Sequence, residues 1–211
     1  GGAWTGQVTI GAAEEDVTLT ATGSGVTGTS NAFQVLAAPT CPCSIWDSAT
    51  APVNTFNADA QAVELGVKFR AATDGYISAL RFYRGASNPG TTFTGHLWTA
   101  GGVLLAEAVF PAGTPAGWQQ VSLSTPVPIT ADTTYIVSYH TSTGYAADRP
   151  YFIEANRALF EWPPLRALVD GEQGGNGIYK YGPSGTFPTD TYQSSNYWVD
   201  VVFETAAPAD T

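Results

Sequence analysis

The sequence predicts an all-β protein whose main part is a two-sheet antiparallel β-sandwich of jelly-roll type. Short stretches in which apolar and polar residues alternate recur along the chain, as in strands with one buried face. The 23 Gly and 14 Pro are spread between these stretches, where they supply tight turns. Long runs of good helix formers such as Ala, Glu, Lys and Leu are missing, which argues against a helical protein.

The N-terminal residues 1–38 contain three or four short strand patterns, around residues 8–10, 17–21 and 33–35, with glycines between them. This stretch resembles the C-terminal half of a bacterial immunoglobulin-like repeat, whose last strand would be residues 28–35. A complete sandwich of that type needs about seven strands. The resemblance therefore predicts a partial immunoglobulin-like β segment, whose missing strands were either cut away or come from another chain.

Residues 39–44 form a predicted linker, stiffened by proline, around the two cysteines of the chain, Cys41 and Cys43. In an oxidising compartment we expect either a disulfide between them or pairing with another chain. A structural tether is favoured over redox catalysis, because a linker offers no helix N-terminus to lower the pKa of a thiol. Residues 206–211 read as a second linker or a tail.

The main domain is predicted over residues 45–205. Its strand patterns lie at residues 63–69, 76–83, 97–98, 103–110, 118–123, 135–139 and 197–203. About eight strands at this spacing indicate two packed sheets. Residues 144–195 lack a core pattern and are rich in aromatic residues, Gly and Pro, with at most one helical turn within 157–170. A long irregular segment of this kind is usually functional, so we expect it to form a binding surface.

Composition and charge exclude several function classes. The 211 residues are 44% hydrophobic, which excludes bulk disorder, and they carry a net charge of −10. An acidic chain without a basic patch argues against nucleic acid and anionic membrane surfaces as partners. No apolar run approaches 18 residues, so we expect no membrane insertion. The low lysine content favours a secreted or cell-surface protein, of which this chain would be a mature piece.

Nine phrases of the main domain, in order, carry a family resemblance. They are VELGVKF (63–69), DGYISALRFYRG (74–85), TGHLWTAGGVLLAEAVF (94–110), GWQQVSL (117–123), PVPITADTTYIVSYHT (126–141), PPLRAL (163–168), NGIYKYG (176–182), FPT (187–189) and NYWVDVVF (196–203). In these phrases the domain resembles DUF4082, a bacterial extracellular family of unknown function. The resemblance implies a secreted or surface location beside adhesive or carbohydrate-active modules. It implies no catalytic residues.

The residues themselves do not favour an enzyme. The two histidines, His96 and His140, lie inside predicted strands, and no GxSxG motif occurs. Glycoside hydrolysis needs a pair of carboxylates, and nothing in the spacing of the candidates singles out a pair. Those candidates are Glu64, Glu107, Glu154, Glu161, Asp190 and Asp200. We therefore expect a non-catalytic protein, with a glycoside hydrolase as a minor alternative.

A calcium site is the one metal site that we consider. Glu64 and Asp200 lie in the first and last strands of the main domain, which often run side by side in a jelly roll, and alternation places both side chains outward. They could share Ca²⁺ through oxygen ligands. The favoured alternative is that they pair with Lys68 or Arg81. A second oxygen-rich group, Asp170, Glu172 and Asn176, could equally be an ordinary solvated loop.

Carbohydrate recognition combines aromatic platforms with a few polar groups, and residues 144–195 contain both. We expect Trp162, Tyr179, Tyr181 and Tyr192 to stack on sugar rings, and Asn176, Asp190 and Arg166 to set specificity. The first hypothesis is thus an extracellular module that binds carbohydrate or another protein surface. The second is a structural subunit of a filament or stalk, which self-associates when residues 1–38 accept a strand from a neighbouring chain.

Overall fold

The computed structural model describes residues 14–35, 41–90 and 92–207, and the chain divides into two compact units, Gly1–Pro39 and Thr40–Thr211. In the first unit, β1 (Glu14–Val17) pairs with β4 (Phe33–Val35), and β2 (Thr20–Gly23) pairs with β3 (Val26–Thr29). Leu19, Val26 and Phe33 are exposed, so these two-stranded sheets have no core among the described residues. The immunoglobulin-like resemblance stays a prediction, and the strand expected at residues 8–10 lies outside the described residues.

The larger sheet of the second unit has eight strands. They are β5 (Val63–Ala71), β7 (Thr94–Thr99), β8 (Leu104–Val109), β10 (Tyr135–Thr141), β11 (Glu161–Trp162), β12 (Leu165–Ala167), β13 (Ile178–Tyr181) and β14 (Asp190–Thr191). The main order is β11-β12-β5-β10-β7-β8, and β13 pairs with both β5 and β14. Its pairings are antiparallel throughout.

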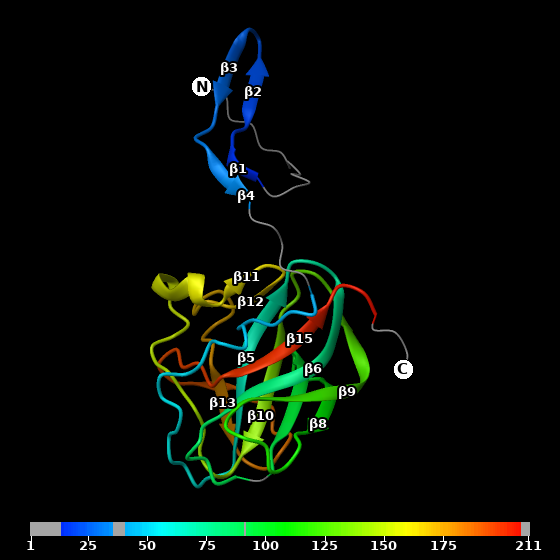
Figure 1. Cartoon of the computed structure of the whole chain (residues 1–211), viewed down its shortest axis with the longest axis vertical. Helices are drawn as coiled ribbons and strands as arrows, with labels where there is room; N and C mark the ends of the chain where they lie inside the picture. Colours follow the sequence, from blue (N-terminus) through cyan, green and yellow to red (C-terminus); the bar gives the residue numbers. More distant parts are fainter. Residues whose placement is uncertain (1–13, 36–40, 91, 208–211) are drawn as a thin grey trace. The chain divides into compact units, whose positions relative to one another are not determined.

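The smaller sheet has the order β15-β6-β9, from β6 (Gly75–Arg84), β9 (Gly117–Ile129) and β15 (Val199–Glu204). It packs across the larger sheet (Figure 1). Val67 and Phe69 of β5 enter one core with Leu80 and Phe82 of β6. The predicted two-sheet antiparallel sandwich is confirmed, because period-two alternation in these strands directs one apolar face of each sheet inward.

The opposite face of the larger sheet is also covered. Trp98, Ile136 and Ile178 form a second, smaller cluster there, against which Phe187 packs. This burial explains why Glu64 and His96, on the same face, are inaccessible to solvent.

The irregular segment 144–195 contributes edge strands. β12 pairs with one end of β5 and β13 pairs with the other. The expected helical turn is a 3-10 helix at Glu154–Leu159, slightly before the predicted place. Part of this segment is therefore structural, because it completes the edge of β5.

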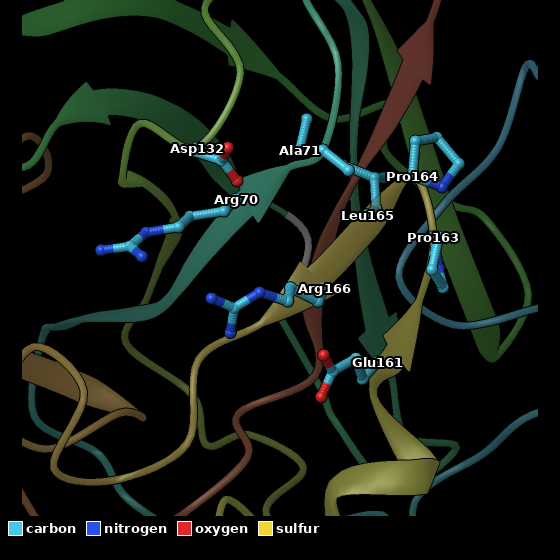
Figure 2. Close-up of a pocket in the computed structure, with 9 residues that line it drawn as sticks. Arg70, Ala71, Asp132, Glu161, Pro163, Pro164, Leu165 and Arg166 are labelled. Carbon is cyan, nitrogen blue, oxygen red and sulfur yellow. The ribbon is translucent and has the colours of Figure 1, made fainter. Parts of the chain in front are cut away.

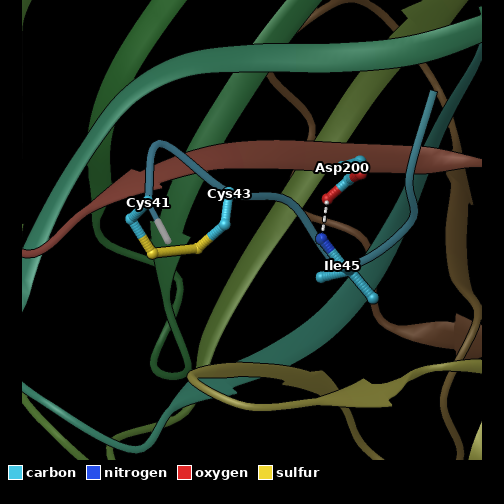
Figure 3. The surroundings of a disulfide bond; sticks show 4 residues. All are labelled: Cys41, Cys43, Ile45 and Asp200. Atoms are coloured by element: carbon cyan, nitrogen blue, oxygen red, sulfur yellow. Dashed lines mark hydrogen bonds between the residues drawn. A yellow bond between two sulfur atoms is a disulfide. The ribbon is translucent and has the colours of Figure 1, made fainter. Parts of the chain in front are cut away.

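The beginning of the second unit is pinned to the smaller sheet (Figure 3). Cys41 and Cys43 form a disulfide, and Cys43 exchanges backbone hydrogen bonds with Phe203 of β15. The backbone N–H groups of Ile45 and Trp46 donate to the Asp200 carboxylate, at 3.0 and 3.3 Å. Residues 41–44 thus belong to the folded unit instead of forming a free linker. No helix among the described residues is long and apolar enough to cross a membrane.

Candidate functional site

The structure distributes the predicted binding residues over three places. Tyr179, Tyr181 and Tyr192 lie together around β13 and β14, where the carboxylate of Asp190 is paired with Lys180 at 3.0 Å. Trp162 and Arg166 lie on the β11–β12 hairpin, where Trp162 is 57% exposed. Asn176 is separate from both and buried. The first group is the candidate site, because it gathers three of the four predicted aromatic rings.

Asn176 is a structural residue, contrary to the prediction that it contacts a ligand. Its side chain is 1% exposed. Its Oδ1 accepts from the backbone N–H groups of Lys68 and Gly177, and its Nδ2 donates to the carbonyls of Lys68 and Leu168. All of its donors and both lone pairs of its oxygen are used within the protein, so it holds the loop before β13 to β5.

The candidate site is a tyrosine patch that four separate parts of the chain build. It comprises Asn57, Asp59, Tyr145, Arg149, Tyr179, Tyr181, Tyr192 and Tyr197. The ring of Tyr179 lies 5.7 Å from Tyr181 and 6.4 Å from Tyr197, whose ring in turn lies 5.7 Å from Tyr145. Tyr197 is buried, whereas Tyr181 and Tyr192 are 46% and 47% exposed. Rings in edge-on contact stabilise one another, so the buried Tyr197 supports the exposed Tyr181 through Tyr179.

Two charged residues lie within the patch. Asp59 accepts a 2.8 Å hydrogen bond from the Tyr181 hydroxyl, and this bond, with burial, raises the pKa of Tyr181 to about 12. Arg149 lies over the ring of Tyr192, with its guanidinium carbon 5.3 Å from the centroid, and donates to Asn57 Oδ1 at 3.1 Å. Burial and the nearby Asp59 also raise the pKa of Tyr145. These tyrosines therefore stay neutral at physiological pH, and the Tyr181 hydroxyl, whose proton is used by Asp59, keeps its oxygen as an acceptor.

Asp148 holds the loops of the patch in place. It is buried, and its carboxylate accepts from the backbone N–H groups of Val53 and Asn54 and from Trp198 Nε1. Its backbone exchanges two hydrogen bonds with Asn196. Three loops thus meet at one carboxylate, directly beside Arg149.

Two glycines allow these loops to approach each other closely. Gly144 has φ +98°, and a Cβ there would lie 2.6 Å from the carbonyl oxygen of Asn57. Gly177 has φ +70°, and a Cβ would overlap the carbonyl oxygen of Ser195. Both positions need a residue without a side chain, so the glycines bring Asn57 and the 192–197 turn against the neighbouring strands.

A hollow of about 160 Å³ beside the β11–β12 hairpin is a weaker candidate (Figure 2). Arg70 and Arg166 stand directly opposite each other on β5 and β12, and Asp132 and Glu161 also line the hollow. Arg166 is paired with Glu172 at 2.9 Å, and Arg70 donates to Thr134 Oγ1. Two guanidiniums and two carboxylates leave the hollow with no excess charge, and Trp162 does not line it.

Comparison with known protein families covers the region that contains the tyrosine patch. The chain matches DUF4082, a domain of unknown function, over residues 49–199. It belongs to the DUF4082 family. The matched residues include the whole tyrosine patch. A search of curated proteins finds no significant match.

Within the DUF4082 domain, Glu64 and Asp200 do not form the predicted shared site. Glu64 belongs to the larger sheet and Asp200 to the smaller, and both are fully buried. The prediction that both side chains point outward does not make them exposed, because other segments cover the outer faces of both sheets. Asp200 pairs with Arg81 at 3.6 Å, as the alternative predicted, but Glu64 pairs with His96 at 2.8 Å and not with Lys68.

The loop that carries the second oxygen-rich group already holds an internal cation. The Lys68 ammonium donates to the carbonyls of Gln173 and Gly175. Asp170 accepts from the Asn176 backbone and the Ser194 hydroxyl. Among the described residues, no group of three or more His, Cys, Asp or Glu side chains converges as a metal site. Calcium binding stays an untested prediction.

Both histidines of the DUF4082 domain contact groups other than hydroxyls. His96 lies between the carboxylates of Glu64 and Glu107, at 2.8 and 3.2 Å, and His140 Nε2 lies 3.2 Å from the Gly182 carbonyl. Ser138 donates to Glu64 at 2.6 Å. The carboxylate thus separates the hydroxyl from the imidazole, so the described part of the chain shows no hydroxyl–imidazole pair of the kind that nucleophilic catalysis uses.

Sequence reasoning missed Asn57, Asp59, Tyr145 and Arg149. Tyr145 and Arg149 lie in the segment that was expected to bind, and their types are common in binding surfaces. Asn57 and Asp59 precede the first predicted strand of the domain. No local pattern connects them with tyrosines that follow about a hundred residues later, so only the fold brings them together.

Proposed function

We propose that this DUF4082 domain is a non-catalytic extracellular binding module that holds carbohydrate on the tyrosine patch. The observation that carries the proposal is the pair of exposed rings, Tyr181 and Tyr192, beside fixed polar groups. Sugar rings present apolar C–H faces to aromatic rings and hydroxyls to amides, carboxylates and phenols. The patch offers each of these partners within one surface.

The polar groups of the patch are already oriented. Asp59 is held by the Tyr181 hydroxyl and the Gln61 N–H, and Asn57 by the Tyr145 carbonyl and Arg149. Groups that are held before the ligand arrives lose little conformational entropy on binding, which favours affinity. The family match and the low content of charged residues are compatible with an extracellular module.

The test is binding of the full chain to an oligosaccharide array, followed by titration calorimetry with the strongest ligand. We expect Tyr181→Ala with Tyr192→Ala to weaken binding at least tenfold. The matched control is Trp162→Ala, an equally exposed aromatic residue outside the patch, which should leave the affinity within about twofold. Absence of binding to any oligosaccharide, or loss of binding only with Trp162→Ala, would contradict the proposal.

A structural subunit of a filament or stalk is the second candidate function. Its supporting observation is the first unit, in which the described strands form only two-stranded sheets and leave Leu19, Val26 and Phe33 exposed. Such sheets are marginally stable alone, and an added strand would complete them. Light scattering across concentration tests this: the full chain should assemble and a chain lacking residues 1–38 should not. A monomer at high concentration in both cases would exclude it.

A further inference from the structure

The cations of the chain differ in how their charge is used, and all eight lie among the described residues. Four are paired with carboxylates: Arg81, Arg157, Arg166 and Lys180. Two are held by backbone carbonyls: Lys68 and Arg84. Arg70 and Arg149 have neither kind of partner among the described residues. Each of these two guanidiniums therefore keeps unused charge.

Arg149 is the exposed member of this pair. One of its N–H groups donates to Asn57 Oδ1, and its guanidinium carbon lies over the ring of Tyr192. A guanidinium has five N–H donors in a fixed fork. The two contacts orient that fork and leave donors free, an arrangement that suits a planar carboxylate.

We propose that Arg149 makes the tyrosine patch selective for carboxylated sugars, of the hexuronic acid class. The inference rests on the proposed function and names its ligand class. The sugar ring that carries the carboxylate packs on the part of the Tyr192 ring that Arg149 leaves uncovered, and its carboxylate accepts from Arg149. Neutral neighbouring sugars extend toward Tyr181 and Asp59.

Charge also limits the ligand to isolated carboxylates. Asp59 is the acidic group of the patch, and it accepts hydroxyl donors such as that of Tyr181. A second carboxylate at that position would be repelled. The net charge of −10 adds a long-range repulsion toward polyanions. The preferred ligand is thus a uronic acid residue set among neutral sugars instead of a polyuronate.

The test compares paired oligosaccharides that differ in one group. The panel contains oligomers of xylose, glucose, galactose and N-acetylglucosamine, each carrying one glucuronic acid residue. Each oligomer is tested in two forms, with the carboxyl group intact and with it reduced to an alcohol. Titration of the full chain should show at least tenfold tighter binding of the acidic member of one pair. High salt should reduce that ratio, because exposed charge pairs are screened.

The variants separate Arg149 from other sources of selectivity. Arg149→Gln should reduce the acid-to-neutral ratio to within about twofold, and Arg149→Lys should give an intermediate ratio, because it keeps the charge and loses the fork. Arg70→Gln is the matched control and should preserve the wild-type ratio. If Arg70→Gln removes the preference for the acidic member and Arg149→Gln does not, the hollow beside the β11–β12 hairpin is the acidic-sugar site and the inference is overturned.

The remaining outcomes distinguish this inference from the proposed function. Equal binding of acidic and neutral members, still lost with Tyr181→Ala and Tyr192→Ala, leaves the carbohydrate proposal standing and overturns the selectivity. Tightest binding of an oligomer made only of uronic acid residues overturns the limit to isolated carboxylates. If no member of any pair binds, both proposals fail.

Discussion

Two aromatic clusters of this protein each hold one arginine against a ring. In the first, Arg81 lies over Trp118 at 4.4 Å, within a cluster that also contains Trp46 and Trp198. In the second, Arg149 lies over Tyr192 at 5.3 Å, within the tyrosine patch. In both clusters a guanidinium lies over an aromatic ring, but Arg81 is buried and Arg149 is exposed to solvent.

The surroundings decide what each arginine can do. Arg81 is 7% exposed and has a fully buried carboxylate, Asp200, at 3.6 Å, together with the Trp46 carbonyl. Arg149 is exposed, and none of the salt bridges among the described residues involves it. A guanidinium with a buried counter-charge is committed to the fold, because removing either partner leaves a buried charge uncompensated, whereas one with free donors in water is available for recognition.

The largest expected effect comes from breaking the buried pair. Asp200→Ala leaves the Arg81 charge without its carboxylate and removes the acceptor of the Ile45 and Trp46 N–H groups. We expect a loss of about 3–5 kcal/mol in the free energy of unfolding at neutral pH, measured by urea denaturation. Asp190→Ala, which breaks the exposed pair with Lys180, should cost far less, because solvent screens that pair.

A double variant distinguishes charge from packing in this cluster. Arg81→Met together with Asp200→Asn removes both charges and keeps a side-chain acceptor for the backbone. Its cost should be clearly smaller than the sum of the costs of Arg81→Met and Asp200→Asn. Additive costs would mean that the ion pair contributes nothing of its own.

The pH dependence of stability tests the same carboxylate. Burial, opposed by Arg81 and by backbone hydrogen bonds, raises the pKa of Asp200 to about 6 from its ordinary value of 3.8. The native state therefore holds this proton at a pH where the unfolded chain has released it. The stability contributed by Asp200 is complete below about pH 4, decreases by about 3 kcal/mol as the pH rises to 6, and is constant above that.

The measurement is the difference between wild type and Asp200→Asn in urea denaturation from pH 4 to pH 7. The asparagine variant cannot ionise, so the difference should change across this interval. A constant difference would show that Asp200 does not titrate there.

His96 forms a third charge pair, with the carboxylates of Glu64 and Glu107. Unlike an arginine, a histidine can lose its charge near neutral pH. Burial disfavours the charged form of His96, but Glu64 and Glu107 outweigh it and raise the pKa of His96 above 6.5. The stability from these bonds is complete below pH 6.5 and is lost as the pH rises through the native pKa. We therefore expect the free energy of unfolding to decrease as the pH rises above 6.5, because the native state holds the proton more tightly than the unfolded chain does.

Thermal unfolding from pH 6 to pH 9 measures this decrease, with His96→Gln as the control that has no titrating group in that place. A wild-type curve parallel to that of His96→Gln would contradict it.

Alternation along the strands made the fold predictable, but it reports only which face a residue joins. It correctly placed Val67 and Phe69 in the core. It also directed Glu64 and Asp200 away from the core, but not into solvent, because segments distant in the sequence cover both faces. Trp198, which shares the outward face with Asp200 in the sequence alternation, is also buried. Its φ of +55° interrupts the regular strand geometry just before β15, and no sequence pattern signals that change.

The site was predictable to the extent that one segment of the sequence contains it. Tyr179, Tyr181 and Tyr192 could be found because they are close in sequence and lie in a stretch without a core pattern. Asn57 and Asp59 reach the patch because Asp148 binds the start of their loop and Asn57 exchanges backbone hydrogen bonds with Tyr145, next to Gly144. The orientation of Arg149 depends on that loop, so its role could not be derived from the sequence alone.

The smallest expected effect completes the comparison of the two arginines. Arg149→Gln removes an exposed contact with Tyr192 and one hydrogen bond to Asn57, for which water can substitute. Its cost in urea denaturation should be within about 0.5–1 kcal/mol, as for an exposed cation–π contact. Arg81→Gln should cost several times more, because it leaves the buried Asp200 charge unpaired. Similar costs for both substitutions would mean that Arg149 is a structural residue like Arg81. A difference in stability, together with loss of acidic-sugar selectivity only in Arg149→Gln, would assign one arginine to the fold and the other to the ligand.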